Sequence, residues 1–177
     1  VCAIRFRARA ALKRAVTTCL KLSPNGDCPN NPHGVITEWD VSRVNNMDKM
    51  FDGASSFNSD ISKWDVSSVT TMSIMFVGAS SFNGDLSKWD VSSVLNMYGM
   101  FQRALSFKGD LGSWDVSRVQ NMYATFRMAA SFNGDISEWD VSSVRNMYGM
   151  FSKASSFNSD ISKWDVSRAQ LMPGMFY

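Results

Sequence analysis

Two series of aspartates recur at intervals of 25 residues, and they are the side chains of this sequence most able to do chemistry. One series follows the repeated tryptophan: Asp40, Asp65, Asp90, Asp115, Asp140 and Asp165. The other is Asp60, Asp85, Asp110, Asp135 and Asp160. Stacked carboxylates repel one another, so backbone N–H groups, neighbouring lysines or a cation such as Ca²⁺ must offset the repulsion. We expect structural hydrogen bonds and no metal site, because calcium-binding repeats are denser in Asp and Gly.

The residues needed for nucleophilic or acid–base catalysis are scarce. The single histidine, His33, lies in a proline-flanked loop. A catalytic site needs residues that occur once and converge, whereas these carboxylates recur in every repeat. We therefore predict that the chain is not an enzyme, with no catalytic residues and no cofactor.

Three cysteines precede the repeats, at positions 2, 19 and 28, without the spacing of a zinc site. Cys19 and Cys28 flank a turn-rich run, and in an oxidising compartment they could close a small loop as a disulfide. Reduced, partly buried thiols are the other interpretation.

The charge is unevenly distributed along the 177 residues. The formal net charge is +2, but six basic residues precede the first acidic one, Asp27, and the chain beyond Lys21 has 12 basic against 16 acidic residues. This balance argues against nucleic acid as a partner. No apolar run approaches the roughly 20 residues of a membrane-spanning helix, so we predict no transmembrane segment in this region.

The basic segment 5–22 has two interpretations. It is Arg-rich and acid-free, as organelle transit peptides are. Its apolar residues Leu12, Ala15, Val16 and Cys19 also share one helical face, which predicts a helix that caps the first repeat. The chain begins without Met and stops partway through a unit, so we expect it to be processed or truncated, and we expect further repeats or a partner to continue the open end.

The repeat itself decides the architecture. Tryptophan recurs every 25 residues, at Trp39, Trp64, Trp89, Trp114, Trp139 and Trp164. Methionine follows in phase at Met47, Met72, Met97, Met122, Met147 and Met172, and phenylalanine at Phe51, Phe76, Phe101, Phe126, Phe151 and Phe176. A unit this small cannot bury its apolar face alone, so these columns must stack on their equivalents in neighbouring units.

The spacing inside a unit predicts a strand and a helix. Apolar residues at 69, 72, 75, 76 and 79 fall on one face of a short helix, and residues 86–91 alternate as a short strand does. The fold class expected is an α/β solenoid, a leucine-rich-repeat-like right-handed coil of 25-residue units with short parallel strands. Residues 1–33 would form the capping helix and loop, and residues 34–177 about six units, the last incomplete.

Three runs of the repeat carry a family resemblance: Trp-Asp-Val-Ser-Ser-Val at 89–94, Asn-Met-Tyr-Gly-Met-Phe at 96–101 and Ala-Ser-Ser-Phe-Asn-Gly-Asp at 79–85. From Gly34 to Tyr177 the chain resembles the BspA-like leucine-rich repeat, also called the DUF285 or mycoplasma lipoprotein-type repeat. The resemblance implies a leucine-rich-repeat-like solenoid of surface proteins, some of which act in adhesion. The chain lacks the usual leucine pattern of such repeats, since Phe, Trp and Met fill the core.

Function is expected where the repeat varies, because variable positions are free of the packing constraint. One variable column places tyrosines in successive middle units, and cationic and apolar residues vary beside it. The candidate partner-binding residues are Tyr98, Tyr123, Tyr148, Leu95, Arg103, Arg127 and Arg145. Aromatic and arginine side chains are the usual anchors of protein interfaces. The alternative is that the tyrosines only shield the flank of the predicted helix.

These observations predict a non-enzymatic interaction or structural module that binds a protein partner. The resemblance implies an extracellular or cell-surface adhesion or coat protein. The alternative is an accessory scaffold subunit in a larger assembly, in an organelle lumen or in a membrane-associated complex.

Overall fold

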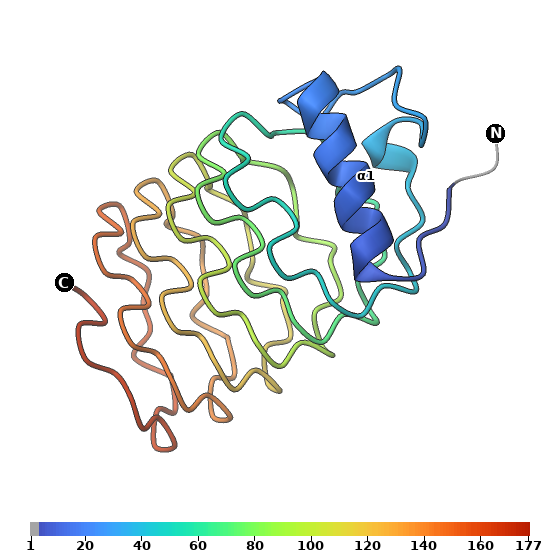
Figure 1. Cartoon of the computed structure of the whole chain (residues 1–177). Helices are drawn as coiled ribbons and strands as arrows, with labels where there is room; N and C mark the ends of the chain where they lie inside the picture. The colour runs from blue at the N-terminus through green and yellow to red at the C-terminus, as the bar shows by residue number, and fades with distance from the viewer. Residues whose placement is uncertain (1–3) are drawn as a thin grey trace.

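The computed structural model describes residues 4–177, and both of its helices lie near the N-terminus. Helix α1 spans Arg9–Leu22, and the 3-10 helix η1 spans Ile36–Glu38. The described chain that follows runs through turns, bends and single parallel bridges. It winds into a stack of coils, with α1 lying across the first coil and the C-terminus at the opposite end (Figure 1).

The predicted α/β solenoid is wrong, because beyond η1 the repeated units of the described chain contain neither a helix nor a strand. Residues 69–79, expected to be helical, contain the bridge residue Thr71 and a run of turns at 73–78. The Met75 N–H donates within the coil to the carbonyl of Met72 at 3.2 Å, but the N–H groups of Ile74 and Phe76 donate to the next coil at 2.7 and 2.8 Å. An α-helix would keep all of these donors inside the segment.

Left-handed backbone, recurring twice in each coil, is the reason that no helix forms. One column has φ between 52° and 64°: Lys49, Ile74, Gly99, Ala124, Gly149 and Gly174. The second has φ between 59° and 72°: Gly53, Gly78, Arg103, Met128 and Lys153. A positive φ cannot belong to a right-handed helix, so the chain turns and directs alternate N–H groups toward the next coil.

The predicted strand at residues 86–91 is also wrong, and with it the leucine-rich-repeat-like unit of strand plus helix. Its centre is a turn, in which the Trp89 N–H donates to the carbonyl of Leu86 at 3.1 Å. The coils are instead joined by isolated parallel bridges, one per coil. These bridges pair Asn46 with Thr71, Thr71 with Asn96, Asn96 with Asn121, Asn121 with Asn146, and Asn146 with Leu171.

Two phenylalanine columns run side by side through the core. In one column the rings of Phe76 and Phe101 stack with centroids 5.5 Å apart, and in the other Phe82 and Phe107 lie 5.9 Å apart. Across the columns Phe76 and Phe82 approach to 4.2 Å. These rings are fully buried. Burial of each contributes roughly 1.5–3 kcal/mol, so the ring columns are a large part of the apolar stabilisation of the stack.

The tryptophan column ties each coil to the one before it. The indole N–H of Trp89 donates to the carbonyl of Ile61 at 3.2 Å, and that of Trp114 donates to the carbonyl of Leu86 at 2.9 Å. Both indoles are buried. A buried N–H needs a partner, and here that partner lies in the preceding coil. The tryptophan therefore serves both as core and as a link between coils.

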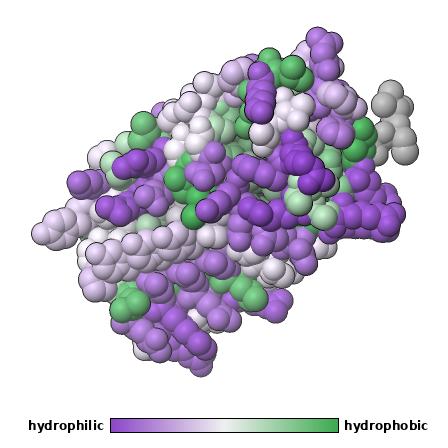
Figure 2. All heavy atoms as spheres, in the orientation of Figure 1, coloured by the Kyte–Doolittle hydropathy of each residue, from purple (hydrophilic) through white to green (hydrophobic). Residues whose placement is uncertain are grey.

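Helix α1 covers the first coil with its apolar face, on which Leu12, Ala15, Val16 and Cys19 are buried. Its C-terminal end is fastened by a disulfide between Cys19 and Cys28. The outer surface of the stack is mostly hydrophilic on the face shown in Figure 2, where apolar residues appear in small separate patches. On that face, particular side chains rather than a broad apolar surface are the candidates for function.

Candidate functional site

The aspartate columns are hydrogen-bonded within their own turns. The Asp90 Oδ1 accepts from the Ser92 N–H at 3.0 Å and from the Ser92 hydroxyl at 2.6 Å. The same backbone bond recurs at Asp40, Asp60, Asp65, Asp85, Asp110, Asp115, Asp135, Asp140, Asp160 and Asp165. This is the structural role expected from the sequence. Within residues 4–177 no three His, Cys, Asp or Glu side chains gather as a metal site would need.

His33 takes part in aromatic packing at the first coil. Its ring meets Phe6 edge to face at 5.7 Å and Trp39 at 6.4 Å. The carbonyl of His33 accepts the indole N–H of Trp39 at 2.8 Å. These contacts give the histidine a packing role at the end of the stack where α1 lies.

The three tyrosines predicted as partner anchors form a ladder. The rings of Tyr98 and Tyr123 stack with centroids 4.8 Å apart, and those of Tyr123 and Tyr148 with centroids 5.3 Å apart. Tyr148 is 43% exposed, and the other two are half-buried. Because the ring faces cover one another, the ladder presents mainly ring edges and hydroxyls to solvent.

A hollow of about 430 Å³ adjoins the C-terminal end of this ladder. It is lined by Tyr123, Arg127, Tyr148, Gly149, Ser152, Lys153, Gly174 and Tyr177. We call this hollow, together with the ladder of Tyr98, Tyr123 and Tyr148, the tyrosine surface. Of the predicted arginines, Arg127 belongs to it. Arg103 lies elsewhere: it is exposed, with φ 59°, and lines neither this hollow nor the groove described next.

Arg127 makes no contribution to the hydrogen bonding of the coil through its side chain. Its Nε is buried and has no hydrogen-bond partner among the described residues. An unpaired buried donor costs roughly 1–3 kcal/mol, so the stability of the stack does not explain this residue.

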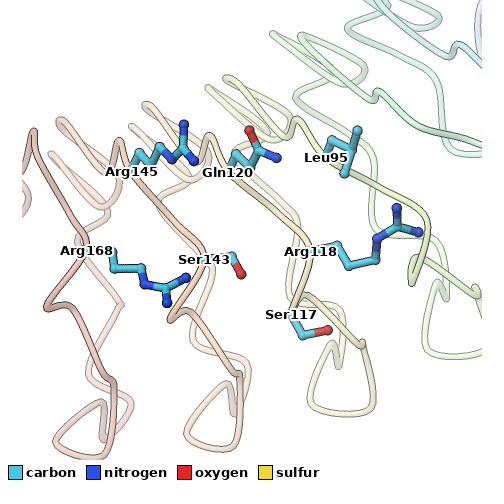
Figure 3. A pocket seen from close by; sticks show the side chains of 7 residues that line it. All are labelled: Leu95, Ser117, Arg118, Gln120, Ser143, Arg145 and Arg168. Atoms are coloured by element: carbon cyan, nitrogen blue, oxygen red, sulfur yellow. The ribbon is translucent and has the colours of Figure 1, made fainter.

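The other two predicted residues, Leu95 and Arg145, line a different hollow, which we call the arginine groove (Figure 3). Its volume is about 280 Å³, and its lining residues are Leu95, Ser117, Arg118, Gln120, Ser143, Arg145 and Arg168. Sequence reasoning missed Arg118 and Arg168. The signal was there, because their column reads Arg43, Ser68, Ser93, Arg118, Ser143 and Arg168 and so varies between a long cation and a small hydroxyl.

That alternation opens the groove. Figure 3 shows Ser143 between Arg118 and Arg168, with Arg145, Gln120 and Leu95 in a parallel row. A serine between two arginines leaves room that a third long side chain would fill. All three arginines are exposed, and none of their side chains makes a hydrogen bond or ion pair with the described residues.

Three aspartates of one column, Asp115, Asp140 and Asp165, belong to the coils that line the groove. A hydrogen bond from Ser117 lowers the pKa of Asp115, and Arg118 lowers it further. A hydrogen bond from Ser167 lowers the pKa of Asp165, and the charge of Arg168 adds to the effect. Serine hydrogen bonds lower the pKa of all three and keep them ionised, but none forms an ion pair with an arginine of the groove among the described residues, so they offset the arginine charge only at a distance.

No helix among residues 4–177 is long and apolar enough to cross a membrane. Among known proteins, the chain matches the family model described as "Mycoplasma protein of unknown function, DUF285" over residues 26–130 and again over residues 107–177. No curated protein and no solved structure matches it. Because the two matched segments together cover residues 26–177, the chain belongs to the DUF285 family.

Proposed function

We propose that this chain is a non-enzymatic interaction module of the cell surface or the secreted space, which supports adhesion or a cell coat by docking a partner protein on the tyrosine surface. The observation that carries the proposal is the ladder of Tyr98, Tyr123 and Tyr148 beside a hollow of about 430 Å³. Tyrosine and arginine are the side chains that dominate binding energy at protein interfaces.

The chemistry of the partner follows from the charges at the rim. Arg127 and Lys153 line the hollow, and neither makes an ion pair with the described residues. The tyrosine rings follow one another at centroid distances of 4.8 and 5.3 Å, so their hydroxyls form a row that can donate hydrogen bonds to, and accept them from, the polar groups of a partner. The partner is therefore a protein segment that carries Asp or Glu together with apolar side chains.

The proposed location has two supports. The disulfide between Cys19 and Cys28 belongs to an oxidising compartment, because cytosolic reductants keep thiols reduced. The repeat also resembles that of BspA-like surface proteins. Mass spectrometry of the native protein, alkylated under denaturing conditions before reduction, tests the location. Unmodified, paired cysteines support it, and alkylation of both Cys19 and Cys28 contradicts it.

The docking surface is tested with a displayed library of random 12-residue peptides selected on the immobilised protein. We expect selected peptides to contain acidic and aromatic or aliphatic residues. Their affinity should fall by at least about tenfold for the Tyr98→Ser/Tyr123→Ser/Tyr148→Ser variant. Serine already occupies this column at Ser73, so the coil accepts it.

The matched control is Leu105→Ser, which removes an apolar side chain that is 46% exposed and lines neither hollow. It should leave peptide affinity unchanged. A Tyr→Phe triple variant keeps the stacked rings and removes the hydroxyls, so it separates ring contacts from hydrogen bonds. Equal affinity of the peptides for wild type and the triple-serine variant would contradict the assignment of the site.

A further inference from the structure

The three arginines of the groove lie in successive coils. Arg118 and Arg168 occupy equivalent positions two coils apart, which places their backbones about 10 Å from each other. Arg145 comes from the coil between them and lies in the adjacent row (Figure 3). Three guanidinium groups thus surround one hollow, at a spacing set by the coils.

Nothing in the described chain neutralises this cluster through direct contact. Like charges held close together raise the energy of the folded protein, and among the described residues Asp115, Asp140 and Asp165 form no ion pair with these arginines. An oxyanion in the groove would relieve the repulsion. Guanidinium groups bind carboxylate, sulfate and phosphate through planar pairs of N–H donors.

The uncharged lining narrows the class of ligand. Ser117, Ser143 and Gln120 supply hydroxyl and amide groups that both donate and accept hydrogen bonds, and Leu95 is the only apolar side chain. A peptide interface would need apolar anchors, whereas a hydroxyl-rich chain pairs with this lining throughout. The groove is also open and runs across several coils, which suits a linear polymer better than a single small molecule.

We propose that the arginine groove binds an acidic polysaccharide, with Arg118, Arg145 and Arg168 contacting its sulfate or carboxylate groups and Ser117, Gln120 and Ser143 its hydroxyls. The groove is distinct from the tyrosine surface, and this proposal does not rest on the protein partner proposed above. Sulfate and carboxylate are the two sources of the oxyanion, and the experiment separates them.

The repeat supplies variants that the fold already accepts. Serine stands in the column of Arg118 and Arg168 at Ser68, Ser93 and Ser143, and glutamine stands in the column of Arg145 at Gln120 and Gln170. The test variant is therefore Arg118→Ser/Arg145→Gln/Arg168→Ser. The matched control is Arg43→Ser, which makes the same change at an equivalent position three coils from Arg118 and outside the groove.

Isothermal titration calorimetry with the full chain would use four probes: a heparin-derived sulfated hexasaccharide, a hexagalacturonate, a neutral dextran hexamer and a hexaglutamate peptide. We expect one or both acidic saccharides to bind, with affinity falling as salt rises. The triple variant should bind at least about tenfold more weakly, and Arg43→Ser should bind like the wild type. Dextran should not bind.

The results separate the alternatives. Binding of only the sulfated or only the carboxylated saccharide identifies the oxyanion. Binding of hexaglutamate in preference to both saccharides, lost in the triple variant, would overturn the ligand class in favour of an acidic peptide. No binding, or equal loss in the triple variant and in Arg43→Ser, would overturn the site. The tyrosine-to-serine variant should bind the saccharides normally, so the failure of one proposal does not imply the failure of the other.

Discussion

The guanidinium of Arg9 donates to the backbone carbonyl of Asp48 at 2.8 and 3.0 Å, where each later coil uses a backbone N–H instead. One repeat later the equivalent carbonyl, that of Ser73, accepts from the N–H of Lys49 at 2.9 Å. The first coil has no coil before it to supply such donors. A basic side chain of α1 therefore replaces the missing backbone donor.

Lys13 repeats this substitution one turn further along the helix. Its ammonium donates to the carbonyl of Met50 at 2.9 Å, and the equivalent carbonyl of Met75 accepts from the Phe51 N–H at 2.8 Å. The basic residues of α1 thus have a structural use at the end of the stack. Their positive charge also suits carbonyl oxygens better than a neutral donor would.

The double variant Arg9→Ala/Lys13→Ala should lower the free energy of unfolding by roughly 1–2 kcal/mol, because the carbonyls lose charge-assisted bonds and regain only water. Urea denaturation followed by tryptophan fluorescence measures the change. Arg14→Ala is the control, since Arg14 is exposed on the same helix and its side chain makes no hydrogen bond with the described residues. Equal urea midpoints for the control and the double variant would contradict this account of the helix.

Sequence reasoning identified the residues of the core but not the backbone that carries them. Val69, Met72 and Phe76 are buried as their spacing indicated. A turn that repeats every three or four residues produces the same apolar spacing as a helix, so periodicity alone cannot separate the two. The available signal was glycine, which interrupts the predicted helices at Gly78 and Gly99 with positive φ.

The candidate surfaces were predicted in part. The tyrosine column was found because three aromatic side chains stood where neighbouring units had Asp and Ser. Arg118 and Arg168 directly follow the repeated Trp-Asp-Val-Ser run, and their column was not among the variable positions predicted to bind a partner. These two arginines meet Arg145 only because their column lies beside the column of Arg145 in the folded coil. That proximity depends on how the chain turns between the two columns, and no spacing in the sequence indicates it.

Gly53 belongs to one of the two columns of residues with positive φ, and a substitution there tests the backbone conformation without disturbing side-chain packing. Its φ is 72°, and a Cβ placed there would meet no atom within 4 Å. Gly53→Ala should therefore cost about 1–2 kcal/mol of unfolding free energy through backbone strain alone. The reciprocal change is Lys153→Gly in the same column, where φ is 59° and the side chain is exposed.

Lys153→Gly should raise the free energy of unfolding by about 0.5–1 kcal/mol, because glycine relieves the strain. Both variants are measured by urea denaturation at equal protein concentration. Shifts of the same sign in the two variants would contradict the role given to the left-handed backbone.

The aspartate turns predict a loss of stability in acid. Hydrogen bonds from Ser42 and from Arg5 lower the pKa of Asp40 from 3.8 to about 2, and serine hydrogen bonds lower the pKa of Asp60, Asp85 and Asp90. A carboxyl group whose pKa is lower in the folded than in the unfolded protein contributes its full stabilisation at pH values above its pKa in the unfolded protein. That stability is lost as the pH falls through the folded value.

Unfolding free energy should therefore decline between about pH 4 and pH 2. Asp40→Asn should be less stable than the wild type at pH 7, and the difference should shrink toward pH 2, where about half of the folded wild-type protein carries a neutral Asp40. Ser42→Ala weakens the same turn from the donor side and should reduce the pH dependence as well. A difference between wild type and Asp40→Asn that stays constant from pH 7 to pH 2 would contradict the turn as its source.

The disulfide between Cys19 and Cys28 closes a short loop, with a sequence separation of 9, between α1 and the segment that leads into the first coil. Cys19 is buried on the face of α1 that contacts the stack, so the bond holds the covering helix in place. Closing a loop of this length removes unfolded-state entropy worth about 2–3 kcal/mol. The Cys19→Ala/Cys28→Ala variant should lose about that much stability, and dithiothreitol should lower the urea midpoint of the wild type but not of the variant.

Hydrogen exchange of the variant should rise first in α1, while the later coils, held by their own ring columns and coil-to-coil bonds, stay protected. Equal loss of protection in α1 and in the last coils would show instead that the stack unfolds as one unit, and that the disulfide acts on the whole chain rather than on its cap.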